Sequence, residues 1–316
     1  MNTEVKSTIS IIMCIIIATP GCYHPTKIKS RKVFITHDRL QALRNKNNTE
    51  QSQQIPTITI WVHGTRLLPS PIFRSYVYCA CGLHLANELP PSYFLRQLSD
   101  AIINADPSRF NHEDFYLFGW TGKLDAAIRE QAAKDLCQDL KKLIAEYHLK
   151  YQCRPFIRLI THSHGGNVAL NLARFKNPEN DLFIDELILL ACPVQDSTKP
   201  YLKDAMFGRV YAMYSSIDLL QILAPQFYWP IQTNSNHKKP SFKFPPTSSR
   251  LFPIQSNMIQ VKIKKNKHAI LHTEFSSARF TQYLPILLDE LNAWNTEDPQ
   301  WRDAPNTKRL LKFYTN

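Results

Sequence analysis

Apolar residues recur along the chain with two periods, one typical of strands and one typical of helices. Between positions 57 and 62 every second residue is apolar and β-branched, which predicts a strand. Short apolar runs predict five more strands, at 114–120, 156–160, 185–192, 210–214 and 258–264. Apolar residues at helical spacing predict helices at 93–104, 124–147 and 280–294. This alternation indicates an α/β protein whose mostly parallel central sheet carries helices on both faces.

The predicted globular part covers residues 55–294. The chain has 316 residues, of which 44% are hydrophobic and 20% charged, and these values are ordinary for a protein with a substantial core. The proline-rich stretch 225–256 is expected to be an irregular insertion that could cover a site. The last strand, 258–264, is expected at the edge of the sheet, because Lys262 and Lys264 alternate with its apolar residues. Residues 295–316 are expected to form a polar, basic tail.

The first 54 residues differ in composition from the rest. Residues 1–22 join a short basic start to an apolar stretch that is typical of a secretory signal and short for a transmembrane span. Gly21 and Cys22 resemble the end of a bacterial lipobox, so we expect an exported lipoprotein that is anchored to the membrane through lipidated Cys22. The alternatives are a plain or uncleaved signal and a cytoplasmic chain. Residues 23–54 are polar and basic, which predicts a tether between membrane and domain.

The net charge of +12 suits nucleic acid, an anionic membrane surface or an acidic substrate. The sequence contains no zinc-finger spacing, no ribonucleoprotein signature and no basic helix with interleaved aromatic residues, so nucleic acid is not an expected partner. The seven cysteines show no metal-binding spacing. We therefore expect neither a metal nor a cofactor.

A serine stands between the predicted strand at 156–160 and the helix that follows it. Ser163 is followed by Gly165, and this strand–turn–helix layout is typical of a nucleophile elbow. Glycine is usual two residues before the serine, and Thr161 stands there instead. The alternative is a helix N-terminus that Ser163 or Thr161 caps without any chemistry.

A serine nucleophile needs a base, and the base needs an acceptor that fixes its tautomer. In a parallel sheet these groups come from the carboxyl ends of strands. Asp218 follows the strand at 210–214 and is the expected acid, with Asp196 as its alternative. His268 follows the last strand and is the expected base, because it lies nearer the strand end than the alternative, His272. Asp218 could instead cap a helix.

Taken together, His63-Gly64, Thr161–Gly166, Ser215–Asp218 and Asn266–His272 resemble the α/β-hydrolase superfamily on its lipase and esterase side, over residues 55–294. The resemblance implies the α/β-hydrolase fold, an oxyanion hole formed by the amides of Thr65 and His164, and acyl transfer through Ser163, Asp218 and His268.

The expected function is hydrolysis of carboxylic esters through an acyl-enzyme. Apolar or lipid-like esters are favoured by the predicted membrane tether, the basic surface and the aromatic and proline-rich loops at 67–92 and 225–256. One alternative is a surface binding protein of the same fold without catalysis, which Thr161 supports. Another is an amidase or thioesterase that uses the same triad.

Overall fold

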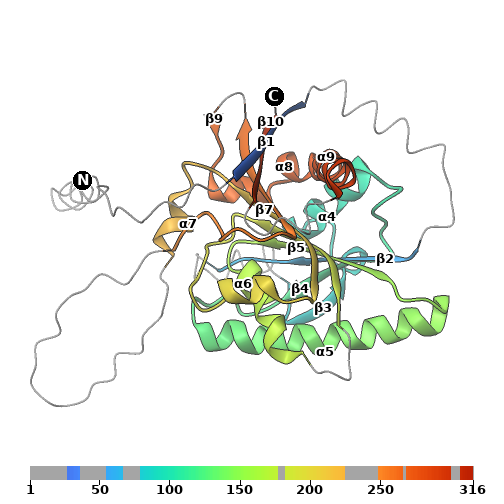
Figure 1. The fold of residues 1–316 in the computed structure, drawn as a ribbon. Coiled ribbons are helices and arrows are strands. Elements are labelled where there is room, and N and C mark those ends of the chain that lie inside the picture. Colours follow the sequence, from blue (N-terminus) through green and yellow to red (C-terminus); the bar gives the residue numbers. More distant parts are fainter. Residues whose placement is uncertain are drawn as a thin grey trace, which may run out of the picture.

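The computed structural model describes residues 27–35, 55–66, 79–176, 182–224, 248–265, 268–299 and 307–315. Figure 1 shows one central twisted sheet with helices packed along it. The expected signal, Cys22 and most of the insertion at 225–256 lie outside the described residues, so these predictions stay untested. Within the described part of the chain, no helix is both long enough and apolar enough to cross a membrane.

Ten strands form the sheet, and they run β1-β10-β8-β7-β6-β5-β2-β4-β3, with β9 paired to β8. Each pairing is parallel except β3 with β4 and β9 with β8. The strands are β1 (Lys27–Ile35), β2 (Thr57–Val62), β3 (Gly82–Leu85), β4 (Phe115–Gly119), β5 (Phe156–His162), β6 (Ile184–Leu190), β7 (Phe207–Tyr214), β8 (Met258–Lys265), β9 (His268–Ala269) and β10 (Thr307–Thr315). Their carboxyl ends therefore meet along one side of the sheet, apart from those of β3 and β9.

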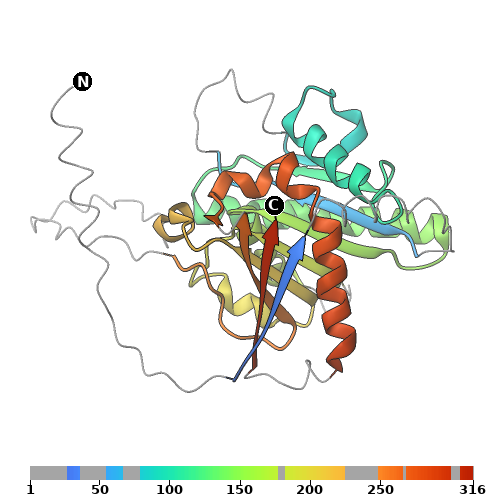
Figure 2. The ribbon, with the colours of Figure 1, turned by 90° about the horizontal axis from the view of Figure 1, so that it is seen from above.

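Helices cover both faces of this sheet, as the alternating pattern predicts (Figure 2). One face packs on α4 (Phe94–Ala105), α8 (Ala278–Thr281) and α9 (Leu284–Glu297) in one apolar cluster. The other packs on α5 (Ala126–Tyr151) and α6 (Gly165–Asn171) in a second cluster. A further helix, α7 (Leu219–Leu223), follows β7, and 3₁₀ turns cover Ala86–Glu88, Leu172–Phe175, Lys199–Lys203 and His272–Ser276. These features confirm the predicted α/β-hydrolase architecture.

The two ends of the described chain differ from the sequence-based expectation. Residues 27–35, expected in a tether, form β1, and residues 307–315, expected in a tail, form β10. The two strands pair in parallel over nine residues, and β10 also pairs with β8. Strand β8 is consequently internal and does not lie at the edge. The pairing of strands this distant in sequence cannot be predicted from local residue patterns, because only the packed sheet brings the two strands together.

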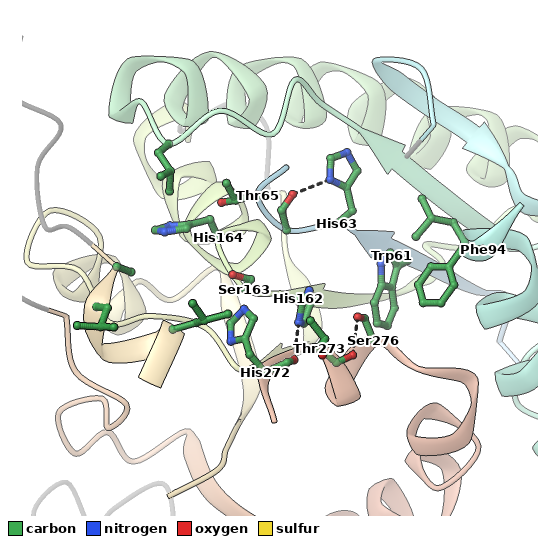
Figure 3. Close-up of a pocket in the computed structure, with 16 residues that line it drawn as sticks. Trp61, His63, Thr65, Phe94, His162, Ser163, His164, His272, Thr273 and Ser276 are labelled. Carbon is green, nitrogen blue, oxygen red and sulfur yellow. Dashed lines mark hydrogen bonds between the residues drawn. The ribbon is translucent and has the colours of Figure 1, made fainter. Parts of the chain in front are cut away.

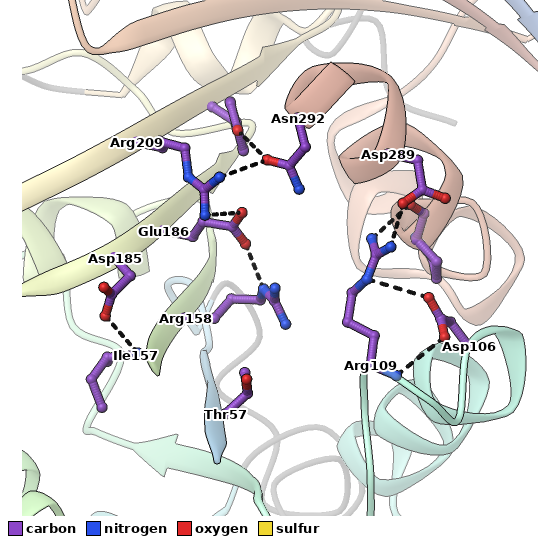
Figure 4. A network of polar contacts seen from close by, with 12 residues as sticks. Thr57, Asp106, Arg109, Ile157, Arg158, Asp185, Glu186, Arg209, Asp289 and Asn292 are labelled. Carbon is purple, nitrogen blue, oxygen red and sulfur yellow. Dashed lines mark hydrogen bonds and ion pairs between the residues drawn. The ribbon is translucent and has the colours of Figure 1, made fainter. Parts of the chain in front are cut away.

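A buried ionic network lies near the amino ends of the central strands, away from the strand ends that carry the candidate chemistry (Figure 4). Glu186 is fully buried, and its carboxylate contacts Arg158 at 2.7 Å and Arg209 at 3.2 Å. These two guanidinium groups outweigh the effect of burial and hold the pKa of Glu186 below its ordinary value. Arg109 contacts Asp289 and so ties α9 to the loop before β4.

Candidate active site

Ser163 occupies the tight turn between β5 and α6. Its φ of 53° lies in the left-handed region, where a residue with a side chain is strained. Its N–H donates to the Leu190 carbonyl at 2.8 Å, and its own carbonyl accepts from the N–H of Gly166 at 3.0 Å. These two bonds hold the strained turn in place. The side chain of Ser163 consequently faces a pocket at the carboxyl end of β5 (Figure 3).

The glycines after Ser163 are required by close packing. A Cβ on Gly165 would lie 2.5 Å from the carbonyl oxygen of Val62, and one on Gly166 would lie 2.5 Å from the sulfur of Cys192. Contacts this short are not tolerated, so any larger residue would push α6 away from the sheet. The small residues therefore set the position of the turn that carries Ser163.

Thr161 stands where a glycine is usual, and the structure shows how it is accommodated. It is fully buried, and its hydroxyl donates to the carbonyl of Ile188 on the neighbouring strand β6 at 3.1 Å. Burying a hydroxyl is costly when the group has no hydrogen-bond partner, and the hydroxyl of Thr161 has one. Thr161 thus bonds β5 to β6 through its side chain and fits in the strand that leads to the turn.

Asp218 follows β7 and has two roles at once. One carboxylate oxygen accepts the N–H of Gln221 at 3.1 Å and caps α7, and the other lies 2.7 Å from Nδ1 of His272. The side chain is buried, whereas the alternative acid, Asp196, has a side chain that is 54% exposed and paired with Lys199. The capping interpretation and the acid interpretation of Asp218 are therefore compatible, since each uses a different oxygen.

The structure places His272, and not the expected His268, beside the acid. His268 is exposed in β9, where an antiparallel pairing aligns it with Lys265. The chain reverses direction after β8 in order to make this pairing, and this carries His268 away from Asp218. Four residues later, His272 begins a 3₁₀ turn and is buried in the pocket wall next to Ser163 (Figure 3).

His162 belongs to the same site, although the sequence analysis did not single it out. Its Nε2 lies 3.1 Å from the carbonyl oxygen of His272, and the two rings lie 4.9 Å apart. Only a protonated Nε2 can donate to that carbonyl. Burial, followed by the charge of His272, lowers the pKa of His162 to about 3, so the ring is neutral at physiological pH. The sequence feature that could have identified His162 as a site residue is its position directly before Ser163.

His63 also lines the pocket, and hydrogen bonds fix the position of its ring. Its Nε2 accepts the backbone N–H of Trp120 at 3.1 Å, so Nδ1 carries the proton and donates to the carbonyl of Gly64 at 2.7 Å. The indole N–H of Trp120 in turn donates to the His63 carbonyl at 2.8 Å. Burial lowers the pKa of His63 to about 4. The neutral ring thus links β4 to the segment that continues to Thr65.

His164 lies on the other side of Ser163. The side-chain amide of Asn167 donates to its Nδ1 at 3.3 Å, which places the proton on Nε2. That Nε2 is buried and has no hydrogen-bond partner among the described residues, although the ring lines the pocket. Burial holds the pKa of His164 well below its ordinary value, so the ring stays neutral. The neutral ring is therefore an enclosed part of the pocket wall.

The pocket that contains these residues has a volume of about 470 Å³. Its polar part is made by Ser163 and the histidines around it. The rest of its wall is largely apolar and comes from β2, from the start of α4, from the segment before α5 and from α7: Trp61, Phe94, Leu95, Leu124, Leu220, Leu223 and Ala224. Thr65 and His164, the two residues expected to supply oxyanion-hole amides, also line it. Within the described ranges, no three side chains of His, Cys, Asp or Glu are grouped as metal ligands would be.

Comparison with known proteins finds no protein family that matches the chain and no curated relative. Among solved structures, phospholipase PlaB from Legionella pneumophila is similar, with 17% identity over 43% of this chain and a TM-score of 0.29. The match spans only 25% of the length of PlaB. Lipase B from Aspergillus fumigatus has 11% identity, covers 64% of this chain and 46% of its own, and has a TM-score of 0.29. An arylesterase has 8% identity, coverage of 96% and 99%, and a TM-score of 0.35. These neighbours are named as lipolytic or ester-cleaving enzymes, and the function of this chain is inferred from its own residues.

Proposed function

We propose that this protein is a serine hydrolase that cleaves carboxylic esters with apolar acyl groups. The nucleophile is Ser163, the base is His272 and the acid is Asp218. The observation that carries the proposal is the 2.7 Å contact between Asp218 and Nδ1 of His272, in a pocket that also holds a strained serine. A hydroxyl, an imidazole and a buried carboxylate in this order are what nucleophilic acyl transfer requires.

The contact with Asp218 determines what the His272 ring can do. Nδ1–H donates to the carboxylate, so Nε2 is left without a proton and can accept the one on the Ser163 hydroxyl. The serine oxygen then attacks the ester carbonyl. His272 passes the proton to the leaving alcohol, and an acyl-enzyme remains. A water molecule, activated by the same nitrogen, attacks this acyl group and releases the acid.

The negative charge that develops on the carbonyl oxygen needs hydrogen-bond donors. We assign this role to the backbone amides of Thr65 and His164, which flank Ser163 in the pocket wall. One such donor contributes about 3–4 kcal/mol to transition-state stabilisation in comparable sites. The hydrogen bonds of His63 to Gly64 and from Trp120 would hold the Thr65 segment in position.

The wall of the pocket favours an apolar acyl group. Phe94 and Leu95 contribute from α4, and Leu220 and Leu223 contribute from α7. A lipid-like ester would fit this apolar wall, and the predicted lipidation of Cys22 would hold the enzyme at a membrane that supplies such esters.

Labelling with a fluorophosphonate probe tests the nucleophile directly. The full chain should be labelled, and Ser163→Ala should not be. Equal labelling of the two proteins would exclude Ser163 as the nucleophile. Hydrolysis of p-nitrophenyl esters with short and long acyl chains would then define the acyl preference, and longer chains should give the higher kcat/KM.

A matched pair of histidine variants tests the base. His272→Gln should lower kcat by about 10³-fold or more, because the serine then has no proton acceptor. His268→Gln removes an imidazole only four residues away, on the exposed strand β9, and should retain the wild-type kcat. The reverse result would return the role of base to His268.

A further inference from the structure

A row of basic side chains crosses the sheet beside α7. In register, Lys262 of β8 pairs with Tyr214 of β7 on one side and with Lys312 of β10 on the other. Lys312 pairs in turn with Lys32 of β1. Paired residues on neighbouring strands point to the same face of a sheet, so the three lysines stand side by side. Like charges in this position destabilise a sheet, and an anion bound to them would remove that cost.

A pocket lies at the end of this row, where Lys262 meets the loop after the insertion. It has a volume of about 420 Å³, and its wall includes Lys262, Arg250 and the hydroxyl-bearing residues Tyr214 and Ser216. None of the described residues that line it is acidic. The pocket is distinct from the one around Ser163, although α7 contributes to both.

Arg250 is held in place by a hydrogen bond, and its main-chain partner belongs to the residue whose carboxylate also attracts it, Asp218. The Nε of Arg250 donates to the backbone carbonyl of Asp218 at 2.9 Å, which fixes the guanidinium beside the loop that carries the acid. Burial, and then the charges of Lys264 and Lys312, lower the pKa of Lys262. Burial also lowers the pKa of Arg250. The charge of Asp218 acts on Arg250 in the opposite sense, but Lys264 and Lys312 add positive charge around Lys262, and this favours an anion beside Lys262.

We propose that the pocket formed by Arg250, Lys262, Tyr214 and Ser216 binds the phosphate group of a phosphate ester. A guanidinium and an ammonium beside two hydroxyls are suited to the oxygens of phosphate. The volume leaves room for part of the organic group that carries the phosphate, and Lys312 and Lys32 extend the positive surface outwards. This site goes beyond the proposed ester hydrolysis and would exist even if that proposal failed.

Thermal unfolding of the full chain tests the site, with inorganic phosphate as the probe and sodium chloride at matched ionic strength as the reference. At a phosphate concentration ten times Kd, Tm should rise by about 2–3 °C over the chloride value. Lys262→Gln and Arg250→Gln should each lose this rise. Lys134→Gln, an exposed lysine of α5, is the matched control and should keep it.

Equal Tm values in phosphate and chloride for the wild type, or a full phosphate shift in both Lys262→Gln and Arg250→Gln, would overturn the proposal. Lys312→Gln lies outside the pocket and provides a second test in case a pocket variant fails to fold. It should weaken phosphate binding several-fold without abolishing it, because it removes only a neighbouring charge. An unchanged Kd in Lys312→Gln would show that the lysine row plays no part.

Two further probes identify the source of the phosphate. Both are used with the variant Ser163→Ala, Cys22→Ser, so that no ester is consumed and no lipid anchor binds the vesicles. If this variant sediments with vesicles of phosphatidylglycerol in phosphatidylcholine, and the further substitution Lys262→Gln abolishes this binding, the ligand is a lipid headgroup. If glycerol phosphate raises Tm and vesicle binding does not depend on Lys262, the ligand is a soluble phosphate ester. Either result supports the site, and a failure of both probes contradicts it.

Discussion

The buried imidazole of His63 should make the stability of this protein depend strongly on pH. His63 is enclosed between Gly64 and Trp120, and burial lowers its pKa from 6.5 to about 4. In the unfolded chain the same ring takes up a proton near pH 6.5. Between these two pH values the unfolded state binds more protons than the folded state. Stability is therefore fully present above pH 6.5 and is lost as the pH falls towards 4.

The magnitude follows from the two pKa values. When the pH falls from 7.5 to 5.0, a group with these two pKa values lowers the free energy of unfolding by about 2 kcal/mol. That is a large fraction of the stability of a typical domain, which is about 5–15 kcal/mol. The loss should level off once the folded protein is also protonated, below about pH 4.

Urea unfolding at pH 7.5 and pH 5.0, for wild type and His63→Gln, measures this contribution. Glutamine can accept a hydrogen bond from the N–H of Trp120 but does not titrate. The decrease in the free energy of unfolding between pH 7.5 and pH 5.0 should therefore be about 2 kcal/mol smaller for His63→Gln than for wild type. His148→Gln removes an exposed imidazole from α5 and should keep the loss that comes from His63. If wild type and His63→Gln lose equal free energy, His63 binds protons equally in both states, and the reasoning fails.

Three further substitutions test the packing and the strain around the site. Gly166→Ala should destabilise the fold by about 1–3 kcal/mol, because its Cβ would lie 2.5 Å from the sulfur of Cys192; an unchanged urea midpoint would contradict this. Glu186→Gln should cost about 3–5 kcal/mol, since it leaves the buried guanidinium of Arg158 without a carboxylate, and calorimetry would show a lowered Tm. Ser163→Gly should raise the unfolding free energy by about 1 kcal/mol while abolishing ester hydrolysis, because glycine adopts a φ of 53° without strain; a loss of stability would mean that the turn stores no strain.

Much of the candidate site could be predicted from local sequence, because its parts lie where apolar runs end. Ser163 and Asp218 each follow a strand that the pattern of apolar residues reveals, and the structure brings both to one side of the sheet. The choice between His268 and His272 could not be made this way. It depends on how the chain reverses after β8, and two histidines four residues apart carry no local signal that distinguishes them.

The sequence by itself determined the order of the six central strands and of the long helices, the parallel sheet and the serine at a strand–helix turn. These features follow from apolar periodicity and from glycines, which act over a few residues. Only the tertiary structure decided that His272 meets Asp218, that His162 contacts the base and that β1 pairs with β10. Those contacts join residues far apart in the chain, and packing of the whole sheet fixes them. Both β1 and β10 are rich in lysine and arginine, so their sequences indicated a tether and a tail until the sheet joined them.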